Sequence, residues 1–322
     1  MSVTINHIAI AAKVSKSVVS KVINERPDVA PETREAVLKV IKDLGYVPSN
    51  KARNLSLGIN KDIAVVLPSD NSVYRNLLFS LYRILSPKGY DLSFHITDHD
   101  GDRETEILRS IRANRLMGLI YFIDPDGGHY REKVIAGLNI PSVILGDGPG
   151  FSGMDRVLCP ESEMTQAMAE IIAAHRGRTL FLSMPESKEY QRRRNDLVKL
   201  SLGKAGCPLK DITFCPGSQV SDEEGYALME KFYDPRHTLI CSLSNVYTKG
   251  VFRFLRDRGQ LERTAKVITL GDVSDFEHQI LGCRSISMPV DVLAEEAAKA
   301  LIDRTEKPKG QPKVIQIPPR IL

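Results

Sequence analysis

Beyond Lys61, short apolar runs alternate with longer amphipathic stretches almost to the end of the chain. The apolar runs predict ten strands, at 62–68, 90–97, 116–123, 141–146, 179–185, 211–215, 238–243, 265–271, 284–288 and 313–317. Helical spacing predicts helices at 73–86, 102–114, 129–138, 161–175, 189–205, 221–233, 246–258 and 290–303. This alternation is typical of parallel sheets with helices on both faces, and ten strands in about 260 residues fit two doubly wound lobes better than one sheet.

The first 61 residues have a different character, because they hold the excess positive charge of the chain. They contain ten Lys and Arg against five Asp and Glu, a formal charge of +5, whereas the whole 322-residue chain carries only +4. Clustered positive charge at one end favours binding to a polyanion, since neutralised phosphates release counterions. A solvated basic face is the alternative interpretation.

Three short helices are predicted within this basic segment. Thr4 and Ser15 are predicted N-caps of two helices that only residues 13–14 separate, so the helices must meet at a sharp angle. A third helix begins at Pro31 and ends before Gly45. Two helices joined by a tight turn and supported by a third form the helix-turn-helix plan. A small three-helix domain with an ordinary polar surface is the alternative.

Polar side chains occupy the predicted outer face of the second helix. They are Lys16, Ser17, Ser20, Lys21 and Asn24. Side chains of these types at the start of a helix can reach base edges and phosphates in a major groove. Lys13 stands in the turn, where a left-handed backbone favours glycine and a non-glycine residue costs on the order of 1 kcal/mol.

The segment 46–58 predicts a short fourth helix. Asn50 is its predicted N-cap, Arg53 and Leu55 lie within it, and Gly58 ends it. A helix of this length is marginal in water but can form on DNA, where Leu55 would act as an apolar wedge in a minor-groove step. A plain linker with an incidental leucine is the alternative.

The motifs A-x-x-A-x-V-S, V-S-x-V-I-N, E-T-R-x-x-V, L-G-Y-x-P and A-R-x-L follow one another within the first 55 residues. In this order they resemble the DNA-binding headpiece and hinge of the lactose repressor (LacI) family of bacterial regulators. The resemblance implies an α + α/β chain: a helix-turn-helix headpiece (1–48), a hinge helix and linker (49–61), and a periplasmic-binding-protein-like core (62–322). The core would divide into lobes of about 62–159 plus 289–318, and 160–288.

The resemblance further implies a homodimeric transcriptional regulator, a repressor by expectation, that binds a palindromic operator. The residues expected to contact DNA are Thr4, Ser15, Lys16, Ser17, Ser20, Lys21, Asn24, Asn50, Arg53 and Leu55. Val18 departs from the threonine usual in the family, which puts one base or phosphate contact in doubt.

A small-molecule effector is expected in the cleft between the two lobes. Matching onto the family places Arg194 where an arginine grips the ligand and Asn245 where a sugar-binding aspartate is usual. Asp272 stands one residue away from the aspartate of the family's Gly-aromatic-Asp segment. Asp70, Ser72 and Tyr74, which follow the first strand of the core, are expected at the mouth of the cleft. An arginine fork with few aligned carboxylates favours an anionic ligand such as a phosphorylated sugar or a sugar acid.

The Gly271-Asp272 segment, together with the asparagine at 245, is similar to the fructose repressor branch of the family. A family member whose core binds no small molecule is an alternative, and a solute-binding protein is another. The second alternative needs export, whereas the first 25 residues lack the apolar segment of a signal peptide.

Other chemistry finds little support in the sequence. Asp98, Asp100 and Asp102 open a calcium-loop pattern, but Arg103 and Arg109 replace its glycine and its glutamate. No phosphate loop, nucleophile elbow or dinucleotide fingerprint occurs, so neither an enzyme nor a metal or other cofactor is expected. Five cysteines without CxxC spacing favour a reducing cytoplasm.

Overall fold

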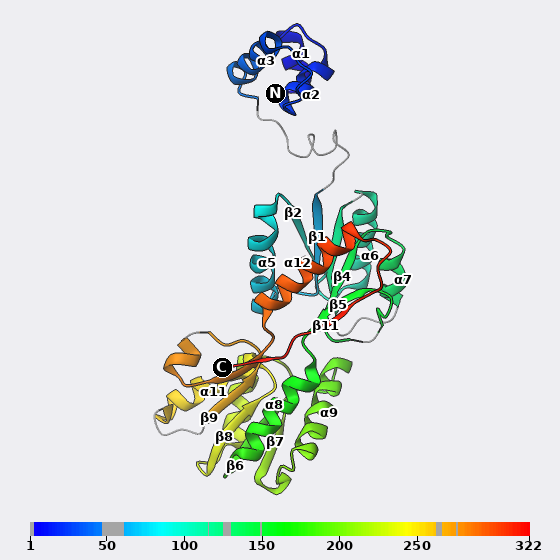
Figure 1. Ribbon diagram of the computed structural model, residues 1–322. Helices are drawn as coiled ribbons and strands as arrows, with labels where there is room; N and C mark the ends of the chain where they lie inside the picture. The colour runs from blue at the N-terminus through cyan, green and yellow to red at the C-terminus, as the bar shows by residue number, and fades with distance from the viewer. Residues whose placement is uncertain are drawn as a thin grey trace. The chain divides into compact units, whose positions relative to one another are not determined.

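The computed structural model describes residues 3–46, 61–114, 116–124, 130–148, 150–261, 266–274 and 276–322 (Figure 1). The chain divides into two compact units, an N-terminal unit of Met1–Lys61 and a core of Asp62–Leu322.

The N-terminal unit is a three-helix domain, as its apolar spacing predicts. Its helices are α1 (Ile5–Ala11), α2 (Lys16–Ile23) and α3 (Pro31–Asp43). One buried cluster joins all three helices, made of Ile8, Ala9, Val19, Val22 and Val37. Ala9 lies in this cluster at 6% exposure, which lets α1 and α2 approach closely.

The turn between α1 and α2 has the predicted strain. Lys13 has φ 54°, in the left-handed region that favours glycine. After the turn, Ser15 caps α2, because its Oγ accepts a hydrogen bond of 3.3 Å from the Val18 N–H. At α1 the N-cap is Thr4, whose backbone N–H donates to His7 Nδ1 at 3.2 Å.

The first lobe of the core is built on a six-stranded parallel sheet with the order β11-β5-β4-β3-β1-β2. Its strands are β1 (Asp62–Leu67), β2 (Asp91–Ile96), β3 (Gly118–Phe122), β4 (Ser142–Leu145), β5 (Asp155–Leu158) and β11 (Val314–Gln316). Helices α5 (Ser72–Leu85) and α12 (Val290–Glu306) pack together on one face (Figure 1). Helices α6 (Gly101–Ala113) and α7 (Tyr130–Ala136) cover the other.

The second lobe repeats this plan with the strand order β12-β10-β9-β8-β6-β7. Its strands are β6 (Arg178–Ser183), β7 (Ile212–Pro216), β8 (His237–Ser242), β9 (Lys266–Leu270), β10 (Arg284–Ser287) and β12 (Arg320–Ile321). Helices α8 (Glu161–Ala174) and α9 (Glu189–Lys204) cover one face. Helices α10 (Asp222–Phe232) and α11 (Asn245–Asp257) cover the other. All pairs are parallel except that of β12 with β10.

The chain passes between the lobes at residues 159–160, 288–289 and 317–319, each time between elements of different sheets. The last passage brings β12 into the second sheet. The predicted lobes end at residue 318 and therefore do not include this strand. In both sheets the first strand lies between the second and the third, so the carboxyl ends of the strands diverge into a crevice where ligands bind in such folds.

The ten predicted strands and eight predicted core helices are all present in the described residues, within a few residues of their expected ends. The prediction missed β5 and β12. β5 has the sequence DRVL, whose charged half does not read as a buried strand. Asp155 is nevertheless buried, since Arg304 contacts both of its carboxylate oxygens at 2.7 Å. β12 has only two residues; it pairs with β10, and Arg320 also contacts Asp291 of α12 at 2.8 Å.

Candidate functional site

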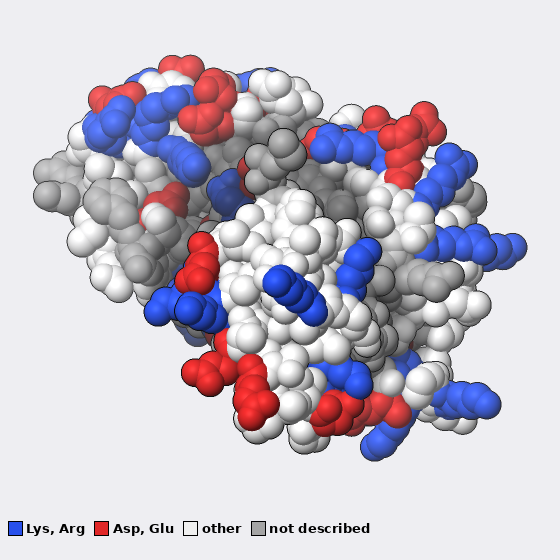
Figure 2. Space-filling view, turned by 90° about the horizontal axis from the view of Figure 1, so that it is seen from above, with Lys and Arg blue, Asp and Glu red and all other residues white. Residues whose placement is uncertain are grey.

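The first candidate site is the outer face of α2. Lys16, Ser17 and Lys21 are exposed there, and the N-caps of the two helices, Thr4 for α1 and Ser15 for α2, are exposed as well. Short polar and basic side chains on an exposed helix of this unit can contact base edges and phosphates. Figure 2 shows Lys and Arg interspersed with Asp and Glu on the face that it displays.

Three of the predicted side chains are more constrained than the sequence suggested. Ser20 and Asn24 are half-buried instead of fully exposed, because Asn24 ends α2 and its Nδ2 donates to Ser20 Oγ at 3.4 Å. Asn24 Oδ1 is buried without a hydrogen-bond partner in the described structure. Lys21 Nζ pairs with Asp28 Oδ2 at 2.6 Å. The predicted contacts Asn50, Arg53 and Leu55 lie outside the described residues.

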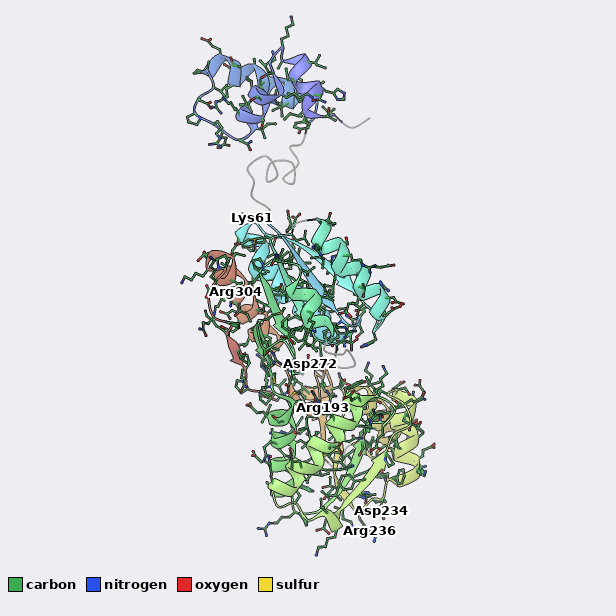
Figure 3. The ribbon with its side chains drawn as sticks, turned by 90° about the vertical axis from the view of Figure 1, so that its right-hand side faces the viewer. Lys61, Arg193, Asp234, Arg236, Asp272 and Arg304 are labelled. Carbon is green, nitrogen blue, oxygen red and sulfur yellow. The ribbon has the colours of Figure 1, made fainter. Side chains whose placement is uncertain are left out.

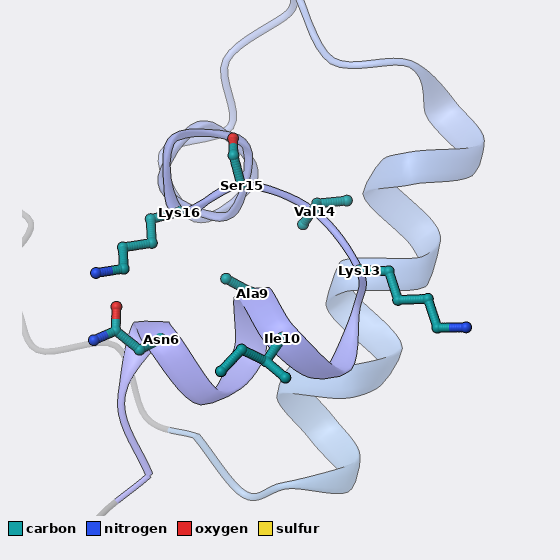
Figure 4. A pocket seen from close by; sticks show the side chains of 7 residues that line it. All are labelled: Asn6, Ala9, Ile10, Lys13, Val14, Ser15 and Lys16. Carbon is teal, nitrogen blue, oxygen red and sulfur yellow. The ribbon is translucent and has the colours of Figure 1, made fainter.

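Asn6 is a polar residue of this surface that the sequence reasoning missed. It lines a surface concavity together with Ile10, Lys13 and Lys16, in the angle between α1 and α2. Asn6 and Lys16 extend toward the same side, whereas Lys13 points to the opposite side (Figure 4). The signal in the sequence was an exposed amide one residue after the start of α1, opposite the buried Ile8 and Ala9.

The second candidate site is a cavity of about 370 Å³ between the lobes of the core. Its lining comes from segments that follow each of β1 to β5, including the start of α8, from segments that follow β8, β9 and β10, and from α9. Tyr74, Arg194, Asn245 and Asp272 are among the lining residues, so the structure brings four of the six predicted effector-site residues together.

Asp70 and Ser72 do not line this cavity, although both were expected at its mouth. Asp70 is exposed and pairs with Arg75 Nη1 at 2.8 Å. Ser72 begins α5 and is exposed. Their neighbours Ser69 and Asn71 line the cavity instead.

Tyr74 forms the apolar wall of the cavity in the first lobe. Its ring packs edge-on against Phe122, with the centroids 4.7 Å apart. Burial raises the pKa of its hydroxyl, so the group stays protonated and can donate a hydrogen bond.

Asp272 lies on the second-lobe side of the cavity, where a hydrogen bond to its backbone carbonyl fixes its position. Asn245 Nδ2 donates to the Asp272 carbonyl at 2.6 Å, and Gly271, at φ 103°, brings the chain close to the Asn245 side chain. Burial raises the pKa of the Asp272 carboxyl, and a hydrogen bond from Ser287 offsets part of that effect. Asn245 therefore fixes Asp272 as well as facing the cavity.

Arg194, the arginine expected to bind the ligand, is paired with the carboxylate of Glu161, which was not among the predicted site residues. Glu161 Oε1 accepts from Arg194 Nε, and Glu161 Oε2 lies 3.2 Å from Arg193 Nη2. Burial works against ionisation of Glu161, yet Arg194 and Arg193 prevail and lower its pKa. Figure 3 places Arg193 and Asp272 where the two lobes meet. The sequence placed Glu161 only at the start of the helix expected at 161–175.

His99 is a further lining residue that was not predicted. It has φ 61°, follows Asp98 at φ 54°, and its Nδ1 lies 3.1 Å from the buried Asp124 Oδ2. Two successive non-glycine residues in the left-handed region are costly, and such strain concentrates at functional sites. Asp124 thus orients the imidazole at the first-lobe wall of the cavity.

Metal and redox chemistry find no centre in the described part of the chain. No group of three or more His, Cys, Asp or Glu side chains there could hold a metal ion. All five cysteines are free and buried, and burial raises the pKa of Cys159, which lines the cavity, to about 12. Among the described helices none is both long and apolar enough to cross a membrane.

Residues 4–49 match the model of the bacterial regulatory proteins of the lacI family. Over 98% of its length the chain is 26% identical to catabolite control protein A of Streptococcus mutans serotype c, of which it covers 95%. The fold is similar to the lac repressor dimer bound to operator and the anti-inducer ONPF (TM-score 0.78, 18% identity, 100% of this chain and 98% of that one). It is also similar to the Cra transcriptional dual regulator of Pseudomonas putida in complex with fructose 1-phosphate (TM-score 0.65, 18% identity, 82% and 97%).

Proposed function

Because this chain belongs to the lacI family of bacterial regulatory proteins, we propose that it is a DNA-binding transcriptional regulator controlled by a small molecule. The observation that carries the proposal is the α1–turn–α2 segment, which presents Lys16, Ser17 and Lys21 on an exposed helix within the region that matches the family. The N-terminal unit recognises the operator, the segment 49–61 links it to the core, and the core binds the effector. The protein acts in the cytoplasm and performs no catalytic step.

The regulator acts as a homodimeric repressor on a palindromic operator, with one N-terminal unit on each half-site and the two Leu55 side chains wedged at the centre. Support for a second copy comes from the first lobe. There β2 is an edge strand that exposes Phe94 at 64%, while α5 exposes Phe79 at 65% and Tyr82 at 58%. Large exposed aromatic side chains on one lobe are typical of an interaction surface.

The effector carries an anionic group, as a phosphorylated sugar or a sugar acid does, and binds in the cavity between the lobes. Arg193 and Arg194 supply two guanidinium forks at one wall, Asp272 and Asn245 supply hydrogen-bonding groups, and Tyr74 offers an apolar face. The fructose 1-phosphate held by the similar Cra regulator supports a ligand of this class. Effector binding shifts the population between two lobe arrangements, which changes the spacing of the two linker segments in the dimer.

Selection of bound duplexes from random DNA tests the regulator proposal. We expect a palindrome of about 14–20 base pairs, two half-sites roughly one helical turn apart. Lys16→Ala is expected to lower operator affinity by about 1–3 kcal/mol. Lys39→Ala, on α3, is the control with the same change of charge and is expected to leave operator affinity unchanged. Recovery of no shared motif, with only salt-sensitive binding, would contradict specific operator recognition.

Titration of sugar phosphates and sugar acids against the protein–operator complex tests the effector proposal. Arg194→Ala and Asp272→Ala are expected to abolish the effect of the active compound on operator affinity while leaving operator affinity itself intact. Arg192→Ala is the matched control, because Arg192 is exposed, lies outside the cavity and donates to the Glu186 carbonyl. Equal responses of the wild type and the Arg194 and Asp272 variants would reject this site.

A further inference from the structure

Glu161 is the first residue of α8 and follows directly on the first passage of the chain between the lobes. Its side chain is 12% exposed, and its two oxygens are divided between two arginines, Arg194 on one and Arg193 on the other. This is the arrangement in which two guanidinium groups bind the oxyanion of a ligand, because each fork offers parallel N–H donors to carboxylate or phosphate oxygens.

The backbone around Glu161 holds its carboxylate in this position. The Glu161 N–H donates to Asp147 Oδ2 at 3.0 Å, and Arg193 Nη2 also donates to the Asp147 carbonyl at 2.9 Å. Asp147 follows β4 in the first lobe, whereas Arg193 belongs to α9 in the second. The charge cluster therefore lies across the junction of the lobes, and its parts are linked through Asp147.

One donor of the cluster is left without an acceptor. Arg193 Nε is buried and has no hydrogen-bond partner in the described structure. A buried guanidinium N–H without a partner carries a desolvation cost that a ligand oxygen can remove. The Arg193–Arg194 pair thus has capacity for an acceptor beyond the two oxygens of Glu161.

We propose that Glu161 is a built-in competitor for the effector's anionic group, so that the cavity selects a phosphoryl group over a carboxylate. The inference rests on the proposed effector function of the cavity. A ligand monocarboxylate brings no more charge and no more acceptor atoms than Glu161 supplies, and Glu161 has the advantage of being tethered next to the arginines. A phosphoryl dianion brings a second negative charge and a third oxygen, which can reach the unpartnered Arg193 Nε.

Exchange of the two anions has a structural consequence. When a phosphoryl group binds the two guanidinium groups, the Glu161 carboxylate loses both of its arginine partners. Glu161 directly follows the 159–160 passage between the lobes, and the hydrogen bond from Arg193 to the Asp147 carbonyl, which joins the lobes, can then also change. Ligand binding is then coupled to the angle between the lobes through the residues that recognise the ligand.

Calorimetric titration of the full-length protein with inorganic phosphate and with acetate, at constant ionic strength, tests the proposal. Wild type is expected to bind phosphate more tightly than acetate. Glu161→Gln is expected to bind phosphate about tenfold more tightly than wild type and to gain a similar factor for acetate, because in the variant neither anion has to displace a charged competitor. Glu163→Gln is the matched control, because it lies on the same turn of α8, is exposed and does not line the cavity.

Further variants separate the outcomes. Arg194→Gln added to Glu161→Gln is expected to remove the gain in phosphate affinity. Glu161→Asp is the second variant in case Glu161→Gln folds poorly: its side chain is too short to span both guanidinium groups, so an intermediate phosphate affinity is expected. Unchanged or weaker phosphate binding in both Glu161 variants would overturn the inference. Operator affinity of the same proteins is measured in parallel. A wild-type protein that does not bind its operator would contradict the proposed function. Normal operator binding, together with phosphate affinities that do not rise in the Glu161 variants, would contradict only the role of Glu161.

Discussion

Asp28 Oδ2 lies 2.6 Å from Lys21 Nζ, so a loop carboxylate holds one of the predicted DNA-contacting cations in free protein. The pair lowers the pKa of Asp28, chiefly through the hydrogen bond from Lys21. Asp28 therefore competes with a phosphate or base for the Lys21 ammonium and offsets its positive charge. We expect the carboxylate to weaken non-specific binding to DNA for this reason.

Asp28→Asn is expected to raise affinity for random-sequence duplex by about threefold at low salt and to steepen the salt dependence by close to one counterion. Fluorescence anisotropy at two salt concentrations measures both. Glu25→Gln is the control, since it makes the same change of charge at a nearby exposed position. Equal gains in the two variants would assign the effect to net charge and not to the Lys21 pair.

Lys13→Gly is expected to stabilise the N-terminal unit by about 1 kcal/mol relative to Lys13→Ala, because both variants lose the charge but only glycine relieves the left-handed backbone. Hydrogen exchange of the α1–α3 amides in the full-length protein reports this free energy. The φ of 54° is the basis of the prediction. Equal exchange rates in the two variants would contradict strain at this turn.

Residue patterns predicted most of the fold, because parallel strands buried on both faces leave continuous apolar runs and the helices leave regular apolar stripes. β1 (DIAVVL) and α5, with Leu77, Leu81 and Leu85 buried, are such cases. β5 could not be predicted this way, because the burial of Asp155 depends on Arg304, 149 residues further along the chain. Local periodicity carries no information about such a partner.

The cavity was predictable to a smaller extent. Arg194, Asn245 and Asp272 follow from the matched positions, and the structure brings them together with Tyr74. Glu161 was not predicted as a partner of Arg194, since Arg194 lies 33 residues further along the chain and only packing of α8 beside α9 brings their side chains together. His99 was not predicted for a related reason: the orientation of its ring depends on Asp124, which follows β3, the next strand in the chain.

Arg304→Ala is expected to lower the free energy of unfolding of the core by about 3–5 kcal/mol, because it leaves the Asp155 carboxylate buried without its guanidinium partner. The two side chains are 16% and 3% exposed, and the Lys313 N–H alone would remain as a donor to Asp155, at 2.8 Å. Urea unfolding followed by circular dichroism measures the change. Lys299→Ala, which removes the surface ion pairs of Lys299 with Glu295 and Glu296 on the same helix, is expected to change stability by less than about 1 kcal/mol. A similar small change for Arg304→Ala would refute the role of this pair.

Asp272→Asn is expected to stabilise the core at neutral pH, with a gain that shrinks as the pH falls toward 3.8, the ordinary pKa of the group. Burial raises the folded-state pKa of Asp272, so the folded chain binds this proton more tightly than the unfolded chain. The free energy of unfolding of the wild type therefore falls as the pH rises between the unfolded and the folded pKa. Unfolding at pH 7 and pH 5 measures the difference between the two proteins. A difference that does not depend on pH would contradict a raised pKa.

Because the chain returns to the first lobe after the second, the first lobe cannot be completed during synthesis until most of the second lobe has been made. α12 and β11 belong to the first lobe, yet they are made after β6 to β10 of the second. On the ribosome, residues 62–158 emerge with the face that α12 later covers still open, including the apolar side chains of β3 and β4 that Leu301 and its neighbours contact. The second lobe can close its sheet from β6 to β10 before the first lobe is complete, although it is encoded later. β11 and β12 are both made after β1 to β10, and each adds the last strand to one sheet, β11 to the first lobe and β12 to the second.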